Sequence, residues 1–224
     1  MKIHVIGDVH GMTSKYCNLL KKIPEGERSF QLGDMGLGFK RVGLPPPGKT
    51  APNPDFHKFI RGNHDNPAKC RAHPQYAGDF GYHTGYSLFW IAGAASIDRD
   101  FRIEGVTWWP DEELDYRTFN AVYDLYVATK PRFVFSHECP TKTNQTLLYS
   151  LSGTYFAAKG DLINTRTCQA MQNMLDEHAP ERWIFGHYHI TKEFHVPGYD
   201  TKFQCLGELD SMVLDTETGE LTHG

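Results

Sequence analysis

The 224-residue sequence lacks the long features that mark membrane-spanning or nucleic-acid-coating proteins. No uncharged apolar run reaches the roughly 20 residues that a membrane-spanning helix needs. No basic tract is longer than two residues, and the formal net charge is −4. The sequence therefore has no electrostatic footprint for binding a duplex. We expect neither a membrane partner nor an extended nucleic-acid surface.

Cysteine pairs of the kind that bind metals or form disulfide frameworks are also absent. The five cysteines are odd in number and form no C-x-x-C motif, which favours reduced thiols inside a cell. The first residues form a short apolar run without a charged leader and long apolar segment. We therefore expect a cytoplasmic protein. The length predicts one domain over residues 1–224, with its oligomeric state left open.

Histidine is the residue type in excess, with 12 copies, and its placement is informative. The apolar residues 3–6, interrupted by His4, predict a buried strand, and Asp8 and His10 follow its end. Residues i and i+2 of an extended strand point the same way, so these two side chains could bind one ion together. Taken alone, the pair fits a loop carboxylate and a surface histidine equally well.

The same arrangement occurs four more times: a short apolar strand, then glycine or serine, then a side chain of a metal-binding type. The further groups are Gly33-Asp34, Gly62-Asn63-His64-Asp65, Ser136-His137 and Gly186-His187-Tyr188-His189. Ligands of open α/β sheets bind beyond the carboxyl ends of the strands. Five strand ends that carry Asp, His and Asn therefore predict a single active site.

In their order and spacing these five groups resemble the motifs of the calcineurin-like metallophosphoesterases, over residues 7–189. The resemblance implies an α/β fold, a four-layer αββα sandwich of two mixed sheets, with the metal site on loops at the C-terminal ends of strands. It implies seven ligands: Asp8, His10 and His189 for one ion, Asn63, His137 and His187 for a second, and Asp34 bridging both. It also implies in-line attack on a phosphate mono- or diester by a metal-bridging hydroxide, with His64 as general acid. Asp65 could orient backbone groups or lie in a surface turn.

The donor types indicate which ions would bind. Oxygen and imidazole donors without thiolate suit Mn²⁺, Fe, Zn²⁺ or Co²⁺ better than Ca²⁺ or Mg²⁺. We expect two divalent ions, with Mn²⁺ as the first choice. Two such ions bring about +4, Asp8 and Asp34 return −2, and a bridging hydroxide leaves about +1. A cluster of this charge would attract an anionic phosphoryl group.

No motif identifies the residue that would contact the phosphate group of the substrate. Protein phosphatases of this family usually continue the second motif with Asp-Arg, whereas Asp34 is followed here by Met35-Gly36-Leu37-Gly38. The candidates are Arg61, Arg99, Arg102 and Arg166. We favour Arg99, because it follows a strand end, and then Arg61. The missing arginine favours the broader phosphodiesterase group over a serine/threonine-type protein phosphatase, which stays the alternative. A non-catalytic scaffold with this fold is a further alternative.

Two other motif matches fail on physical grounds. Residues 43–50 match the phosphate-binding pattern G-x-x-x-x-G-K-[ST], but three of the four intervening residues are prolines without an N–H to offer. The tetrapeptide His137-Glu138-Cys139-Pro140 fails the H-E-x-x-H spacing of a metalloprotease, and its proline opposes a continuing helix.

Periodicity predicts the remaining elements. We expect helices over residues 12–23, 66–72, 111–129 and 166–178, strands over 86–91, 190–196, 202–206 and 212–214, and a loop over 138–164.

Overall fold

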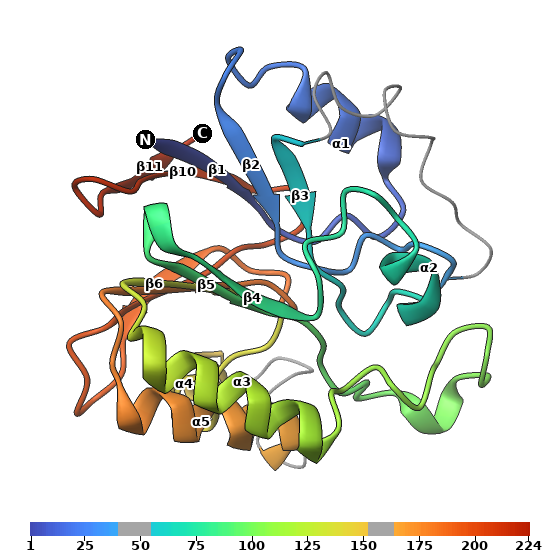
Figure 1. Ribbon diagram of the computed structural model, residues 1–224. Helices are drawn as coiled ribbons and strands as arrows, with labels where there is room; N and C mark the ends of the chain where they lie inside the picture. The colour runs from blue at the N-terminus through green and yellow to red at the C-terminus, as the bar shows by residue number, and fades with distance from the viewer. Residues whose placement is uncertain (40–54, 152–163) are drawn as a thin grey trace.

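Two mixed β-sheets lie face to face in the middle of the protein, and helices cover both outer faces (Figure 1). The computed structural model describes residues 1–39, 55–151 and 164–224. The proline-rich segment with the phosphate-loop pattern at 43–50 lies outside these residues. The layers are those of the αββα sandwich expected from the sequence.

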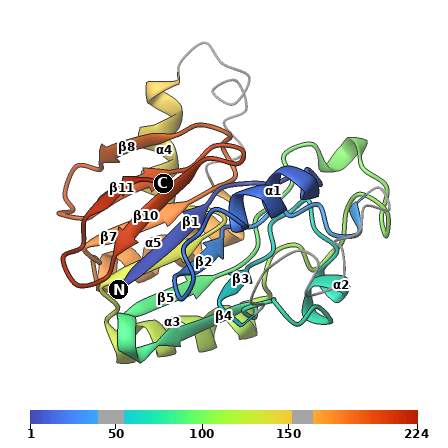
Figure 2. The ribbon, with the colours of Figure 1, turned by 90° about the horizontal axis from the view of Figure 1, so that it is seen from above.

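The first sheet contains β1 (Lys2–Ile6), β2 (Arg28–Gln31), β3 (His57–Phe59), β10 (Ser211–Asp215) and β11 (Leu221–His223). Its strand order is β11-β10-β1-β2-β3. β1, β2 and β3 run parallel, and β10 pairs antiparallel with β1. The helices α1 (Thr13–Leu20) and α2 (Pro67–Arg71) lie on the outer side of this sheet, as Figures 1 and 2 show.

The second sheet contains β4 (Phe80–His83), β5 (Leu88–Ile91), β6 (Phe133–Ser136), β7 (Arg182–Phe185), β8 (Lys192–His195) and β9 (Lys202–Cys205). Its strand order is β4-β5-β6-β7-β9-β8. The four central strands β5, β6, β7 and β9 run parallel, and the edge strands β4 and β8 pair antiparallel with their neighbours. The helices α3 (Tyr116–Thr129), α4 (Thr141–Ser150) and α5 (Arg166–Glu177) cover its outer face (Figure 1).

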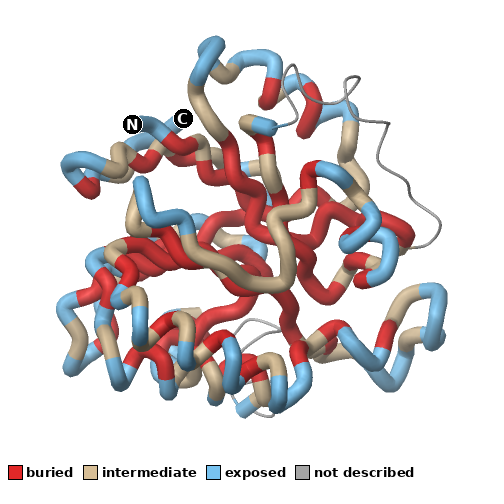
Figure 3. The backbone as a smooth tube through the Cα atoms, viewed as in Figure 1, coloured by how far each residue is buried: buried red, intermediate tan, exposed pale blue. Residues whose placement is uncertain are grey.

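Three apolar clusters hold the layers together. Between the sheets, Phe30 of the first sheet packs edge-on against Phe135 of the second, with ring centroids 5.4 Å apart. A second cluster joins the second sheet to α3, α4 and α5, with Trp183 at its centre. A third joins the first sheet to α1 and α2. Figure 3 shows this burial concentrated along the central strands, which makes them a rigid base for the loops at their ends.

Several elements differ from the sequence-based expectations. The stretch 138–164, expected to be a loop, contains α4, whose sequence TKTNQTLLYS has few strong helix formers but buries Leu147 and Leu148. The helix expected over 111–129 begins only at Tyr116, because Asp115 caps it by accepting from the backbone N–H of Thr118 at 2.7 Å.

Two strands were not predicted. β4 contains Gly81, a poor strand former, which is required here because a Cβ would lie 2.3 Å from Cζ2 of Trp90. β11 is a three-residue edge strand that pairs only with β10. Single 3₁₀ turns are found at η2 (Thr84–Tyr86) and η3 (Arg99–Phe101). Among the helices in the described ranges, none is long and apolar enough to cross a membrane.

Candidate metal centre

All seven expected metal ligands follow the C-terminal ends of parallel strands. From the first sheet, Asp8 and His10 follow β1, Asp34 follows β2 and Asn63 follows β3. From the second sheet, His137 follows β6, and His187 and His189 follow β7. The strand ends of both sheets therefore face one region, and the donors fall into two groups that share Asp34.

The first group contains Asp8, His10, Asp34 and His189, whose donor atoms lie within 4.8 Å of one another. Nε2 of His10 lies 2.9 Å from Nε2 of His189, and it lies 3.7 Å from the nearest carboxylate oxygens of Asp8 and Asp34. Asp8 is fully buried, whereas the His189 side chain is 37% exposed, so this group opens to solvent on one side.

The second group contains Asp34, His137 and His187, and all three are buried. Nε2 of His137 lies 3.3 Å from Oδ1 of Asp34 and 3.2 Å from Oδ1 of Asn63. The other ring nitrogen of His137 faces the carbonyl oxygen of Leu32 at 2.9 Å, which fixes the orientation of the ring.

Four of the seven residues have left-handed backbone conformations that are unfavourable for side chains other than glycine. The φ angles are 46° for His10, 55° for Asp34, 71° for His187 and 55° for His189. Each such residue costs on the order of 1–3 kcal/mol, and such strain gathers at functional sites. Backbone hydrogen bonds stabilise the turns: the carbonyl oxygen of Asp34 accepts from the N–H groups of Val9 and His10 at 3.0 and 2.7 Å.

Three motif glycines leave the space that the ligands fill. A Cβ on Gly62 would lie 2.2 Å from Oδ1 of Asp34 and 2.4 Å from Nε2 of His137. A Cβ on Gly33 would lie 2.5 Å from Nδ1 of His137, and one on Gly186 would lie 2.4 Å from Oδ1 of Asp8. The glycines of the sequence motifs therefore serve close packing around the donors.

The charged side chains at the site favour a bound cation. Burial alone would raise the pKa of Asp34, but His137 and His64 hold that pKa well below its usual range. Burial likewise opposes a charge on His137, yet the neighbouring Asp34 raises the pKa of His137 to about 10. Over the described part of the chain, no Lys or Arg side chain forms an ion pair with Asp8 or Asp34. Buried carboxylates with only imidazoles and an amide around them fit bound metal ions.

His64 lies beside these groups and is held by an arginine. Nη2 of Arg102 lies 2.6 Å from Nε2 of His64, and the His64 ring stacks on Phe39 with centroids 4.7 Å apart. Burial lowers the pKa of His64 to about 4, with Arg102 acting in the same direction and Asp34 opposing. A guanidinium can only donate hydrogen bonds, so Nε2 of His64 accepts here and the imidazole is neutral.

The family model for calcineurin-like phosphoesterases matches residues 1–191. The chain belongs to this family. No curated protein matches the sequence.

Solved structures share the fold at low sequence identity. GAP50, the anchor in the inner membrane complex of Plasmodium, is 11% identical with a TM-score of 0.55, and the match covers 100% of this chain and 88% of that one. The phosphopantetheinyl hydrolase PptH of Mycobacterium tuberculosis is 11% identical with a TM-score of 0.48, covering 92% and 89%. An archaeal phosphodiesterase is 13% identical with a TM-score of 0.43, covering 100% and 99%. The likeness to GAP50 shows a shared fold.

In this calcineurin-like phosphoesterase the arginine at the site is Arg102. Its guanidinium also donates to Oγ of Ser96 at 2.8 Å and to the carbonyl oxygen of Asn63 at 3.2 Å, and it pairs with Asp98 at 2.6 Å. Ser96 in turn donates to the buried carboxylate of Glu112. From the sequence, Arg102 is only one of four candidates.

The arginines that were favoured from the sequence lie elsewhere. Arg61 is 0% exposed, and it donates to Asp79 at 2.7 Å and to the carbonyl oxygen of Glu112 at 2.6 Å. These contacts correct the expectation that Arg61 meets the substrate. The guanidinium of Arg99 lies over the Trp108 ring, 4.1 Å from its centroid. Arg166 pairs with Glu113 at 3.7 Å, at the start of α5.

Three carboxylates around the centre have roles that the motifs alone left open or did not indicate. Asp65 is buried and accepts from the backbone N–H groups of Met35, Leu37 and Gly62, so it orients the loops that carry the ligands. Glu138 lies 3.6 Å from His187, and Glu208 lies 3.6 Å from His189 and 3.8 Å from His10. Glu208 follows β9 through Gly207, the same arrangement as in the ligand groups, so the sequence contained a signal for it that the family motifs do not include.

Two adjoining cavities open beside the donors. The smaller, of about 120 Å³, is lined by ligands that include Asp34, Asn63, His187 and His189. The larger, of about 460 Å³, contains His10, Phe39, Phe101 and Ile103 in its wall. His64, Asp98 and Arg102 belong to both walls and therefore lie where the cavities meet.

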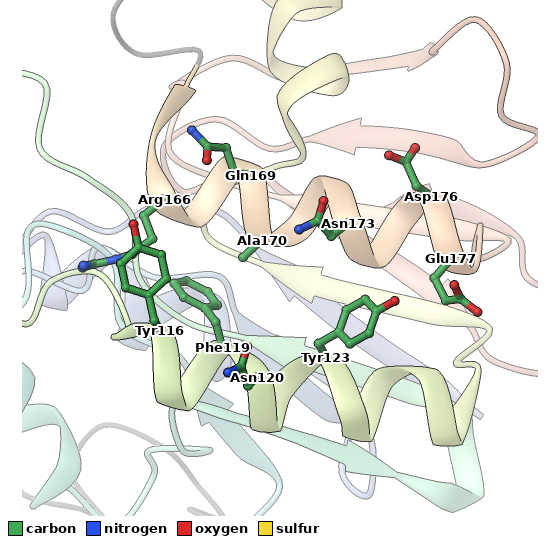
Figure 4. Close-up of a pocket in the computed structure, with 10 residues that line it drawn as sticks. All are labelled: Tyr116, Phe119, Asn120, Tyr123, Arg166, Gln169, Ala170, Asn173, Asp176 and Glu177. Carbon is green, nitrogen blue, oxygen red and sulfur yellow. The ribbon is translucent and has the colours of Figure 1, made fainter.

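A separate groove of about 540 Å³ runs between α3 and α5 (Figure 4). Figure 4 shows Tyr116 and Tyr123 on α3 facing Ala170 and Asn173 on α5. Its lining contains no candidate metal ligand, and Asp176 at one end is engaged by Lys142. The candidate metal ligands lie instead at the two cavities at the strand ends.

Proposed function

We propose that this protein is a metal-dependent phosphoesterase that hydrolyses phosphate monoesters or diesters. The observation that carries the proposal is the gathering of seven oxygen and imidazole donors, four of which line a cavity that also contains the Arg102–His64 pair. Membership of the calcineurin-like phosphoesterase family supports the same reaction class.

Two divalent ions, with Mn²⁺ as the first candidate, would be held by the two groups of donors. Asp8, His10 and His189 would hold one ion, Asn63, His137 and His187 the other, and Asp34 would be shared. When bound, the ions would supply positive charge to a phosphoryl group and make water more acidic. Five of the seven donors are buried, and hydrogen bonds orient Asp34 and His137, so these donors would bind the ions with little reorganisation.

Arg102 and His64 would act on the ester itself. A phosphoryl group in the smaller cavity would meet the Arg102 guanidinium, and a phosphate oxygen could replace His64 as the acceptor of its Nη2–H. Nε2 of His64 would then be free to take up a proton from solvent, which the anionic phosphoryl group beside it would favour, and to donate that proton to the oxygen of the leaving group. At about 120 Å³ this cavity is about a quarter of the volume of the larger one, at about 460 Å³, which suits a phosphoryl group better than a whole ester.

The cysteines and the net charge of the chain support a location and a class of partner. All five cysteines are buried thiols, which supports a reducing, cytoplasmic location. With a net charge of −4 and short basic tracts, we propose a small phosphate ester as the partner rather than a nucleic-acid duplex or a membrane.

A scaffold function is the second candidate, because proteins of one fold can differ in function. GAP50, with the same fold, is an anchor. The complete donor set and the placement of His64 favour an enzyme here.

The test is metal content together with turnover. The purified protein would be loaded with Mn²⁺, its bound metal measured, and its activity assayed with phosphomonoesters, phosphodiesters, cyclic nucleotides and a phosphopeptide. We expect two ions per chain and turnover that is lost in His137→Ala but kept in His195→Ala, a change at an exposed histidine on β8. Two bound ions without turnover of any ester would favour the scaffold, and turnover of the phosphopeptide alone would favour a protein phosphatase.

A further inference from the structure

Apolar side chains in contact with solvent gather beside the candidate site. Phe101 is 85% exposed, Ile103 65% and Val106 43%, all within one short segment. In the described ranges only three other large apolar side chains are exposed: Met1, Tyr116 and Tyr149. Exposed apolar groups that cluster in this way often mark a binding surface.

Two of these three residues line the larger cavity. Phe101 and Ile103 form part of its wall together with Phe39, whereas Val106 does not. The cavity wall therefore combines aromatic and aliphatic side chains with His64 and Arg102, and Phe39 stacks on the His64 ring. Interactions with its neighbours fix the polar part of the wall: Arg102 is only 5% exposed and paired with Asp98.

The junction of the two cavities sets the direction of a bound ester. The smaller cavity is lined by donors of the candidate metal centre, and it shares His64, Asp98 and Arg102 with the larger cavity. An ester with its phosphoryl group among the donors and its leaving-group oxygen at His64 would extend its leaving group into the larger cavity.

We propose that Phe39, Phe101 and Ile103 form a subsite for an apolar leaving group, so that the natural substrate is a phosphate ester of an aliphatic or aromatic alcohol. The subsite rests on the proposed phosphoesterase function and adds the substrate class to it. A sugar or other polyhydroxylated leaving group would leave its hydroxyls without partners against these three side chains.

The subsite predicts how kcat/KM depends on the length of an alkyl leaving group. Burying one methylene fully changes an affinity by up to about fourfold. Because Phe101 and Ile103 remain partly open to solvent, we expect about twofold per methylene. Leaving-group acidity hardly changes between propanol and hexanol, so a rise in kcat/KM along that series reports contact with the protein rather than chemistry.

The experiment measures kcat/KM of the Mn²⁺-loaded protein with n-propyl, n-butyl, n-pentyl and n-hexyl phosphate. The matching alkyl methylphosphonates, which have one leaving group each, serve as diester analogues. The series is repeated with the double variant Phe101→Ser/Ile103→Ser and with Val106→Ser as control, since Val106 belongs to the same exposed segment but not to the cavity wall. We expect about an eightfold rise from propyl to hexyl in the wild type and in Val106→Ser, and a flat series in the double variant.

The outcomes separate this subsite from the proposed function. Turnover with a flat series in the wild type, or a rise that persists in the double variant, would overturn the subsite and leave the phosphoesterase function intact. No turnover of any ester, activated aryl esters included, would overturn both.

Discussion

Nη2 of Arg102 lies 2.6 Å from Nε2 of His64, the nitrogen that would face a leaving group. Arg102 is held from the other side by Asp98, Ser96 and the backbone of Asn63. Because Asn63 and His64 are neighbours in the chain, one guanidinium thereby links a candidate metal ligand to the candidate proton donor. The Arg102–His64 contact therefore lies where the two cavities meet.

Removing the guanidinium should reduce catalysis without emptying the metal centre. We expect Arg102→Gln to lower kcat/KM about 10- to 100-fold, because a hydrogen bond to a charged group contributes about 1.5–3 kcal/mol. Bound Mn²⁺, measured in parallel, should stay at the wild-type level. Arg99→Gln is the matched control, since Arg99 stacks on Trp108 and should change kcat/KM less than about twofold. A larger effect at Arg99 than at Arg102 would reverse the assignment of the two arginines.

His64 should matter for turnover more than for metal binding. In His64→Ala we expect kcat for an alkyl ester to fall by roughly 10²–10⁴, the usual range for general acid catalysis. An activated aryl ester needs less protonation of its leaving group, so its kcat should fall less. Metal content and kcat with both esters would be measured for this variant and for Asn63→Ala. If His64→Ala lost metal while Asn63→Ala kept it, the two roles would have to be exchanged.

The strand-end motifs were sufficient to predict which side chains gather at the candidate site, because parallel strands bring their C-terminal ends together whatever the details of packing. The position of Arg102 could not be predicted in this way. Arg99 and Arg102 lie three residues apart in and beside η3, and only the tertiary contacts decide which one faces His64. The helix α4 was missed for a related reason, since burial of Leu147 and Leu148 outweighs the weak helix propensity of its threonines and asparagine.

The close approach of Gly62 to two donors predicts sensitivity to a single methyl group. In Gly62→Ala the new Cβ would overlap Oδ1 of Asp34, which accepts from the backbone N–H of His64, and Nε2 of His137, which lies 3.2 Å from Oδ1 of Asn63. We expect the affinity for the second ion to fall about tenfold or more, and the free energy of unfolding to fall by about 1–3 kcal/mol. Metal titration and urea unfolding would measure the two effects. Gly85→Ala, whose Cβ would meet only the exposed His83 ring, should leave both unchanged.

The buried Arg61–Asp79 pair predicts a pH-dependent contribution to stability away from the site. Burial alone would raise the pKa of Asp79, but Arg61, Tyr76 and Arg71 outweigh it and lower that pKa below its ordinary value. Asp79→Asn should lower the free energy of unfolding by about 3 kcal/mol at pH 7, because the Arg61 charge stays buried without its partner.

The direction of the pH effect follows from the lowered pKa. The contribution of Asp79 is present above the unfolded-state pKa of about 3.9, and it is lost as the pH falls through the folded-state pKa. Urea unfolding should therefore show a constant difference between wild type and Asp79→Asn from about pH 5 to 8, shrinking below about pH 4. Asp200→Asn, at an exposed position, should show no difference. A gap that widened toward acid pH would contradict this account of the pair.

Asn63 provides a neutral oxygen where a carboxylate has nearly the same shape, and its surroundings predict what the exchange would do. Nδ2 of Asn63 donates to Oγ of Ser96 at 3.4 Å, and that hydroxyl already donates its own proton to Glu112. In Asn63→Asp the donor would be lost, and a carboxylate would face an oxygen that has no proton left to offer. It would also join Asp8 and Asp34, which are already buried.

We therefore expect Asn63→Asp to be destabilised when metal is removed and to recover when metal is added. A cost of about 2 kcal/mol for the unsatisfied group corresponds to a melting temperature lower by about 4–8 °C in EDTA. With Mn²⁺ the difference should nearly vanish, because the carboxylate is the stronger ligand and binding to the folded state adds stability. At the same time kcat/KM for phosphate esters should fall, since the carboxylate removes one positive charge from the centre. Thermal unfolding with EDTA and with Mn²⁺ would be compared for wild type, Asn63→Asp and Asn63→Ala, the last of which should respond least to Mn²⁺. An equal response in all three would mean that residue 63 does not contact the second ion.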